Sequence, residues 1–458
     1  MPKTILFSPV GGSDPISKHH DGALLHICRI YHPDIVYLYM SKEILDYKKA
    51  DDRYVYCLNK LMELDQFEMD IHEIPRPELV NVHRFDNFYD DFEKILNDLR
   101  NQYPKDDILI NITSATPAMK SCLMVLATLE ELDVKAIQVD TPSKAMNSKG
   151  FDRSEPPYDV KKEWLEDEDN RPEGFENRSS VEHCPTLYRI KYEQIIGNLL
   201  TSYDYAAALE VARTLPAHQT VVYLPLLEMA SRRQLLDTQG AMDILRAHPL
   251  DADIFPVKDE RYIDAFEYML DLEIKQRQGK YADFIRALSP LIVDLFWLIL
   301  EDHFGITQDK YCSRFKNKNQ DQIEWDRHKM AGTEVDQIFT QYYQVRKKQF
   351  KYGPVYSTAL MILIRAKSKD KELRALVKKI RTIEQKVRNQ TAHEIVSITD
   401  AQIVEKTGGP KNGMTSADIV AKLKEAFGYT NMALSGVGWD AYDTMNAALI
   451  KKIDGTKR

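Results

Sequence analysis

Hydrophobic positions follow two different periods along this chain. In the first 140 residues, short β-branched and aromatic runs alternate with stretches whose apolar positions recur every three or four residues. The short runs predict strands, and the longer stretches predict amphipathic helices. The expected strands are Thr4–Ser8, Ile35–Met40, Met69–Ile74, Ile108–Thr113 and Val134–Val139, and the expected helices are Gly22–Tyr31, Lys42–Leu64, Phe88–Asn101 and Pro117–Leu132.

This alternation predicts an α/β domain with a parallel, doubly wound sheet. Ligands of such sheets bind beyond the carboxyl ends of the strands. After Leu187 the apolar spacing is helical throughout, with no strand run of comparable quality, so an all-α region is expected to follow.

The pattern dissolves between Thr141 and Pro185, which marks a domain boundary. Glu155–Glu176 holds nine acidic and three basic residues. We interpret it as a linker that closes the first domain, and an acidic interaction tail is the alternative. A second, softer break lies near Asp251–Lys258. The predicted domains are therefore an α/β domain at 1–180, a helical connecting domain at 181–257 and a second helical domain at 258–458.

Composition narrows the class of protein. The chain has 458 residues, 43% of them hydrophobic and 29% charged, which argues against wholesale disorder. Its formal net charge of −8 disfavours a protein that coats duplex DNA. The most apolar stretch, Leu291–Leu300, is too short to span a bilayer and contains Asp294. The five cysteines lie far apart, which favours reduced thiols over a zinc site, and we expect a cytoplasmic protein without a membrane partner.

Two polar segments follow the first and fourth expected strands. Ser8–Pro15 contains the pair Gly11 and Gly12, and Asn111–Pro117 is rich in hydroxyl residues and leads into a helix. Glycine lets a backbone approach a ligand closely, and hydroxyl groups beside a helix N-terminus can donate to phosphate. Neither segment is a Walker A loop or a G-x-G-x-x-G motif, so an ATPase or a dinucleotide dehydrogenase is poorly supported. The alternative is a plain turn and a plain helix cap.

A second constellation, Arg388–His393, lies near the end of a long basic helix. Arg-x-x-x-x-His suits metal-free RNA cleavage, because the histidine can transfer protons while the arginine stabilises charge on the phosphorane. The spacing occurs three times in the chain and is not specific alone. Arg365–Arg388 carries ten bases and three acids, which indicates a surface that attracts phosphate. The alternative is a solvated basic helix with an incidental histidine.

Together, SPVGGSDP, NITSATPAMKS and the C-terminal R-N-x-x-x-H resemble the Csm-type ancillary ribonucleases of type III CRISPR systems. The resemblance covers the whole chain. It implies an N-terminal, Rossmann-like CARF domain that binds cyclic oligoadenylate and a C-terminal HEPN domain that cuts single-stranded RNA. Ala115 stands where many CARF sequences have glycine. The implied catalytic residues are Arg388, Asn389 and His393, and the implied ligand-binding residues are Gly11, Gly12, Asp14, Asn111, Thr113, Ser114, Ala115, Thr116 and Lys120.

The resemblance also implies how the protein works. We expect an endoribonuclease without metal or cofactor that is activated by cyclic oligoadenylate, hexa-adenylate in preference to tetra-adenylate, and that spares DNA. Positions five apart on a straight helix differ by about 140° in azimuth, so we expect a homodimer to share one RNase site. The CARF domain would slowly cut its own activator. The alternatives are a non-catalytic sensor acting on a partner and a constitutive HEPN toxin.

Overall fold

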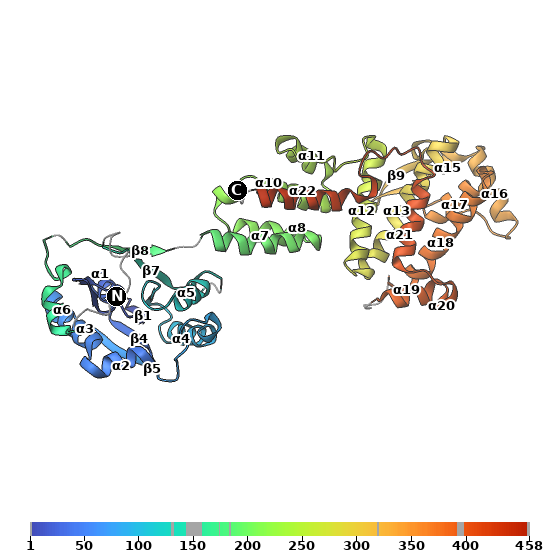
Figure 1. Ribbon diagram of the computed structural model, residues 1–458. Helices are drawn as coiled ribbons and strands as arrows, with labels where there is room; N and C mark the ends of the chain where they lie inside the picture. The colour runs from blue at the N-terminus through green and yellow to red at the C-terminus, as the bar shows by residue number, and fades with distance from the viewer. Residues whose placement is uncertain are drawn as a thin grey trace. The chain divides into compact units, whose positions relative to one another are not determined.

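The computed structural model describes residues 2–129, 132–142, 158–173, 175–182, 185–317, 320–391 and 398–455. Contacts divide the chain into two compact units, Met1–Lys191 and Tyr192–Arg458, so the division falls inside helix α7. The first unit is α/β and the second is mostly helical, which confirms the predicted fold class (Figure 1). This division into two units does not test whether residues 181–257 form a separate connecting domain.

A six-stranded sheet in the order β5-β4-β1-β6-β7-β8 organises the N-terminal unit. All five predicted strands are present and pair in parallel. The edge strand β8 is antiparallel to β7, and its sequence SSVE carries no apolar run that predicts a strand. The strands are β1 Thr4–Pro9, β4 Ile35–Ser41, β5 Asp70–Arg76, β6 Asp107–Asn111, β7 Lys135–Val139 and β8 Ser179–Glu182, beside a small hairpin of β2 Ile16–Ser17 and β3 His20–Asp21.

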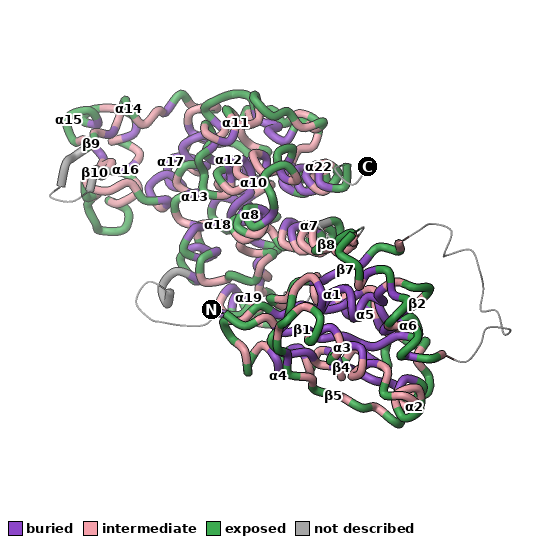
Figure 2. The backbone as a smooth tube through the Cα atoms, turned by 90° about the vertical axis from the view of Figure 1, so that its left-hand side faces the viewer, coloured by how far each residue is buried: buried purple, intermediate pink, exposed green. Residues whose placement is uncertain are grey.

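Helices cover both faces of this sheet, as the doubly wound pattern predicts. Side chains alternate between the faces, so Leu6 packs with α1 and α3 while Phe7 packs with α4 and α5. The central strands are accordingly buried (Figure 2). The helix predicted at Lys42–Leu64 is two helices, because Asp52 between them has a left-handed φ of 52°. The helices are α1 Ala23–Tyr31, α2 Lys42–Asp51, α3 Arg53–Asp65, α4 Tyr89–Gln102 and α5 Pro117–Leu129.

The described part of the acidic segment is folded onto the N-terminal unit. Asp159 caps helix α6 (Val160–Glu166) by accepting from two backbone N–H groups. Asp167 and Asp169 are buried around a short 3-10 helix, Glu168–Asn170. The backbone N–H of Glu168 also donates to the carbonyl of His19. These contacts make the described acidic residues part of the domain that they close.

The C-terminal unit packs around helix α13 (Tyr281–Phe304), which contacts α12, α17 and α18. Inside it, buried Arg233 makes a bidentate pair with Glu267, with both N–O distances at 2.8 Å. The other helices are α7 Pro185–Thr201, α8 Tyr205–Arg213, α9 Ala217–Thr220, α10 Leu224–Gln234, α11 Thr238–Ala247, α12 Glu260–Arg277, α14 Gln308–Tyr311, α15 Arg327–Met330, α16 Glu334–Gln344, α17 Ser357–Lys367, α18 Lys371–Thr391, α19 Asp400–Thr407, α20 Gly409–Asn412, α21 Ser416–Phe427 and α22 Ala441–Gly455.

An antiparallel hairpin interrupts the helical unit. Strands β9 (Cys312–Asn317) and β10 (Gln320–Trp325) pair from Cys312 opposite Trp325 onward. The expectation that everything after Leu187 is helical is therefore wrong at this point. The two strands read CSRFKN and QDQIEW, and their charged and amide residues break the alternation by which a strand is recognised.

The described cysteines, Cys28, Cys57, Cys122 and Cys312, are buried free thiols. Burial raises the pKa of Cys122 and Cys312 to about 12, so both stay protonated at neutral pH. Cys184 lies outside the described residues. None of the described helices combines the length and apolar character that crossing a bilayer requires.

Candidate functional site

The two predicted loops meet at the point where the strand order of the sheet reverses. From β1 the chain builds the sheet toward β4 and β5 on one side and toward β6 and β7 on the other. Phe7 of β1 pairs with Ile110 of β6, so the next residues, Ser8 and Asn111, lie side by side. The Asn111 Nδ2 donates to Ser8 Oγ at 2.9 Å. This is the position in a doubly wound sheet where ligands bind.

The loops also touch through their main chains. A Cβ atom on Gly11 would lie 2.4 Å from the backbone nitrogen of Ala115, whereas one on Gly12 would meet nothing within 4 Å. Ala115 itself has a φ of 71°, a left-handed conformation that favours glycine. The departure from glycine at this position therefore leaves the loop path intact but places an alanine in a strained conformation.

The Asp14 side chain positions the first loop through hydrogen bonds to the backbone. Its carboxylate is buried and accepts hydrogen bonds from the N–H groups of Gly11 at 2.9 Å and Leu24 at 3.0 Å. The second bond fixes the N-terminus of α1. Burial raises the pKa of Asp14, and these bonds, together with one from the Ser114 hydroxyl, partly offset that effect. Asp14 therefore links both loops and the helix that follows the first one.

Asn111 shapes the second loop in a similar way. Its Oδ1 accepts from the N–H groups of Thr113 at 2.9 Å and Ser114 at 3.1 Å. Its Nδ2 donates to Ser114 Oγ at 2.9 Å. Asn111 and Ser114 are buried, like Asp14. In this arrangement the three polar side chains bind one another and the backbone, so they position the loops.

The residues left at the surface of the site are Gly12, Thr113, Ala115, Thr116 and Lys120. Thr113 Oγ1 accepts from the Val139 N–H at 2.7 Å, which leaves its own hydroxyl hydrogen for a ligand. Thr116 instead donates to the carbonyl of Val82 at 2.6 Å and caps α5 by accepting from Met119 N–H at 3.4 Å. Of the two threonine hydroxyls, that of Thr113 is the one free to donate.

Lys120 supplies positive charge near this edge of the sheet. It lies in the first turns of α5, and it is half-buried. Burial lowers the pKa of its ammonium group, and the nearby Asp14 carboxylate opposes that effect. A lysine held beside a helix N-terminus is suited to an anionic ligand.

The bond between Thr116 and Val82 brings in a segment that the sequence analysis missed. Exposed His83 and Arg84 follow Val82 in the connection between β5 and α4. Their nearness to the second loop depends on a contact between residues 34 positions apart, and no motif in the connection signals it. The connection that carries these two exposed residues therefore touches the second predicted ligand loop.

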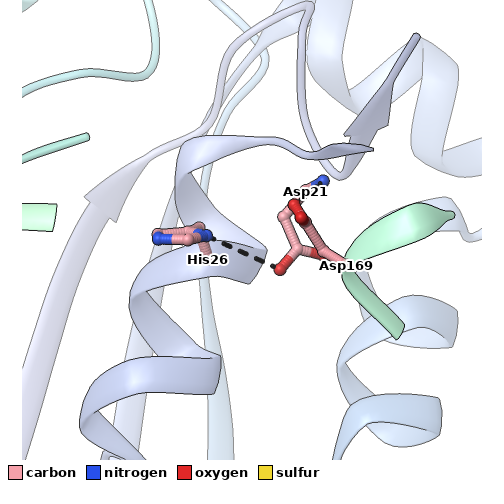
Figure 3. Close-up of side chains that lie close together, drawn as sticks. All are labelled: Asp21, His26 and Asp169. Atoms are coloured by element: carbon pink, nitrogen blue, oxygen red, sulfur yellow. Dashed lines mark hydrogen bonds and ion pairs between the residues drawn. The ribbon is translucent and has the colours of Figure 1, made fainter. Parts of the chain in front are cut away.

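A buried cluster of charged residues fastens the acidic segment to α1, and sequence reasoning missed it too. Ligand atoms of Asp21, His26 and Asp169 lie within 4.8 Å of one another (Figure 3). Arg29 Nε donates to Asp21 at 2.7 Å, and Arg178 Nη2 donates to Asp169 at 2.7 Å. The two arginines neutralise the carboxylates that would otherwise be available to bind a metal cation. Burial and Arg178 together lower the pKa of His26 to about 4.

Asp167 completes this cluster as a protonated acid. Its side chain is buried and lies beside the Asp21 carboxylate. Burial, with the neighbouring Asp21 carboxylate, raises the pKa of Asp167 to about 8. A proton on Asp167 can be donated to Asp21, which satisfies both groups.

The predicted catalytic motif begins in the last turn of α18. The helix buries the predicted apolar stripe, which confirms its amphipathic character: Leu373, Leu376, Val377, Ile380, Ile383 and Val387. The backbones of Arg388 and Asn389 belong to the helix, and His393 lies outside the described residues. The roles of all three residues therefore stay predictions.

Three family models match the chain in succession. The Csm6 CARF domain matches residues 70–179, the Csm6 6H domain matches 184–234, and the Csm6 HEPN domain matches 254–450. Together they span both units. The HEPN match contains the whole of α18 and position 393, and the CARF match contains the second ligand loop.

Curated relatives are CRISPR system endoribonucleases named Csm6. The Mycobacterium tuberculosis protein is 28% identical over 455 residues, which cover 98% of this chain and 99% of the relative. The Enterococcus italicus protein is 32% identical over 302 residues, which cover 64% of this chain and 66% of the relative. A solved structure of Enterococcus italicus Csm6 bound to cyclic hexa-2′-fluoro-hexa-dAMP has the same fold, with a TM-score of 0.67, 17% identity and coverage of 98% of this chain and 100% of that one.

Proposed function

This chain belongs to the Csm6 family of CRISPR-associated endoribonucleases, and from that premise we propose that cyclic oligoadenylate bound at its sheet activates RNA cleavage in its helical unit. The observation that carries the proposal is the meeting of the Gly11–Asp14 and Asn111–Thr116 loops at the reversal point of the sheet. Backbone N–H groups, the Thr113 hydroxyl and Lys120 offer hydrogen bonds and charge to phosphate there.

The activator in this proposal is a ring of six adenylates in preference to four. The Enterococcus italicus structure of the same fold holds a ring of six nucleotides. A ring with rotational symmetry is best received by a symmetric pair of sites, so two copies of this chain would surround one ligand. Each copy contributes one set of the two loops.

In the proposed reaction, His393 takes the proton from an RNA 2′-hydroxyl as its oxygen attacks the adjacent phosphorus. The bond from phosphorus to the 5′-oxygen breaks, and that oxygen receives a proton from the second copy's histidine. The Arg388 guanidinium stabilises the negative charge on the phosphorane. The products are a 2′,3′-cyclic phosphate and a 5′-hydroxyl. Because DNA lacks the attacking 2′-hydroxyl, it is not a substrate.

This chemistry requires no metal ion. Among the described residues of the helical unit, no three histidine, cysteine, aspartate or glutamate side chains bring ligand atoms together as a metal site would. Arginine and histidine provide the charge stabilisation and the proton transfer that metal ions provide in two-metal nucleases.

We also propose that the N-terminal unit slowly cuts its own activator. The bound ring supplies its own 2′-hydroxyl beside each phosphate, and Thr113 can donate to the charge that develops. The two ligand loops contain no histidine, and the exposed His83 stands on a neighbouring connection. Cleavage would accordingly be slow. It would act as a timer, because slow loss of the ring would limit how long RNA cleavage stays activated.

Ring-size panels test the proposal. Purified protein is incubated with a fluorescence-quenched single-stranded RNA and with cyclic tetra- or hexa-adenylate. Cleavage that depends on the hexa-adenylate ring supports activation. Cleavage without any ring would favour a constitutive RNase, and ring binding without cleavage would favour a sensor that acts through a partner.

A further inference from the structure

A large groove opens in the helical unit between α13, the α17–α18 pair and the connection between α16 and α17. Its volume is about 1530 Å³. Sites for single small molecules are typically about 300–1,000 Å³, so this groove has room for an extended ligand. The residues of its wall that matter here are Arg286, Lys348, Lys351, Tyr352, Tyr356 and Arg381. We refer to it as the α13–α17 groove.

Aromatic rings form one part of the wall of the α13–α17 groove. Phe350 stacks on Phe339 with ring centroids 4.2 Å apart, and Trp325 packs edge-on against Phe339. Tyr352, which is 38% exposed, packs edge-on against Phe350, and Tyr356, which is 56% exposed, also lines the groove. Exposed rings on a fixed support are the surfaces on which unpaired nucleobases stack.

Four positively charged side chains also line the groove. Arg286, Lys348, Lys351 and Arg381 line the groove against a single acid, Glu384. Glu384 is 3% exposed, accepts from Ser357 Oγ at 2.6 Å and lies 3.4 Å from Arg381. The chain as a whole has a net charge of −8, so this concentration of cations is local. Cations alternating with aromatic rings match a single-stranded polyanion with bases.

The groove borders the helix that carries the predicted catalytic arginine. Arg381 and Glu384 line it from α18, which continues to Thr391. At about 100° per residue, positions 381, 384 and 388 fall within about 60° of one another on the helix. Position 388 lies about 10 Å beyond position 381 along the axis. Position 388 therefore lies on the same helix face as the two groove residues of α18.

We propose that the α13–α17 groove holds the single-stranded RNA next to the bond that is cut, with bases stacked on Tyr352 and Tyr356 and phosphates beside Arg286, Lys348 and Lys351. This proposal rests on the proposed RNase function and extends it to the binding of substrate. The groove thereby fixes the register of the strand relative to Arg388 and requires the RNA to be unpaired.

Binding of a 2′-O-methyl RNA oligonucleotide to the full-length protein tests this, measured by fluorescence anisotropy. The methyl group blocks the attacking hydroxyl, so the measurement does not depend on cleavage. We expect Tyr356→Ala to weaken binding about tenfold, within the range measured for the loss of one stacked base, and Tyr356→Phe to bind like the parent. Affinity unchanged by Tyr356→Ala would overturn the proposal.

Arg286 has a matched control in Arg246. Both are exposed, with 57% and 68% of their side chains accessible, and each pairs with an aspartate three residues earlier in its helix. Arg246 does not line the groove. We expect Arg286→Ala to lower the salt dependence of log affinity by about 0.7, the value for one phosphate contact, and Arg246→Ala to leave it unchanged. Equal effects of the two variants would contradict the proposal.

Two further results separate this proposal from others. If Tyr356→Ala dissociates a dimer in sedimentation while its RNA affinity stays unchanged, the groove binds a second copy of the chain and the proposal fails. If the parent protein binds the oligonucleotide through Tyr356 but never cuts RNA with any ring, the groove assignment stands and the proposed activation fails.

Discussion

Gly11 and Ala115 mark the point where two loops that are far apart in the sequence approach each other through their main chains: a Cβ atom at position 11 would lie 2.4 Å from the nitrogen of Ala115. The loops come from adjacent strands, β1 and β6, at the reversal point of the sheet. Glycine is required here for the contact between the loops, whatever it contributes to a ligand. The proposed ligand site therefore depends on a close approach of backbone to backbone.

Gly11→Ala should separate the two loops. We expect it to lower the free energy of unfolding by about 1–3 kcal/mol, because the added methyl overlaps backbone that cannot move aside freely. Calorimetric titration with cyclic hexa-adenylate should show binding at least tenfold weaker than the parent. Gly12→Ala is the matched control, because its Cβ meets nothing within 4 Å, and binding lost equally in both variants would count against this reading of Gly11.

Ala115→Gly should relax the second loop. The φ of 71° is strained for alanine by about 1–2 kcal/mol, and glycine removes that strain while adding freedom to the unfolded chain. We expect a free energy of unfolding equal to the parent's or up to about 1 kcal/mol higher, measured by denaturant titration. A clear loss of stability would show that the methyl group packs favourably.

Asp167 should make the stability of the N-terminal unit depend on pH. Its pKa is about 8 in the folded protein against an ordinary 3.8, so between these values the folded state holds a proton that the unfolded chain has lost. The contribution of Asp167 to stability therefore falls as the pH rises from about 4 to about 8, while His26, whose pKa is lowered from 6.5 to about 4, makes an opposite contribution between those two values. Asp167→Asn carries a permanently neutral side chain, and its melting temperature should fall less over this range. Identical slopes for both proteins would refute a protonated Asp167.

The timer activity should require the hydroxyl of Thr113. In a His393→Ala background, where the RNase centre is disabled, cyclic hexa-adenylate should be converted slowly to linear fragments that chromatography resolves. Thr113→Ala should stop this conversion, and Thr113→Ser should retain it. Thr116 is a less direct probe, because its hydroxyl already caps α5 and binds Val82. A ring left intact by the His393→Ala protein would make the N-terminal unit a passive sensor.

The sequence pattern predicts those elements whose apolar residues follow a simple period. The strands that end at Pro9 and Asn111 are buried on both faces, and their loops meet where parallel-sheet rules place them. The edge strand Ser179–Glu182 and the hairpin Cys312–Trp325 are polar, and tertiary pairing alone makes them strands. Asp52 splits a predicted helix without any glycine or proline as a signal.

Within the site, the sequence predicts which residues gather but not what each does. Asn111 and Ser114 look like ligand-binding residues in the motif, yet their side chains are buried and bind each other. Thr116 binds the carbonyl of Val82. Asp169 accepts from both Arg178 and the backbone N–H of Asp21. These contacts join segments that have no common motif. Such relationships arise from the packed fold and have no periodic trace in the chain.

Ring-dependent RNA cleavage can be measured with a quenched single-stranded RNA and the full-length protein, with and without cyclic hexa-adenylate, in excess EDTA. We predict cutting only when the ring is present, products that end in a 2′,3′-cyclic phosphate, and no cutting by His393→Ala. Cutting that ignores the ring, or products with a 5′-phosphate and a 3′-hydroxyl, would contradict this prediction.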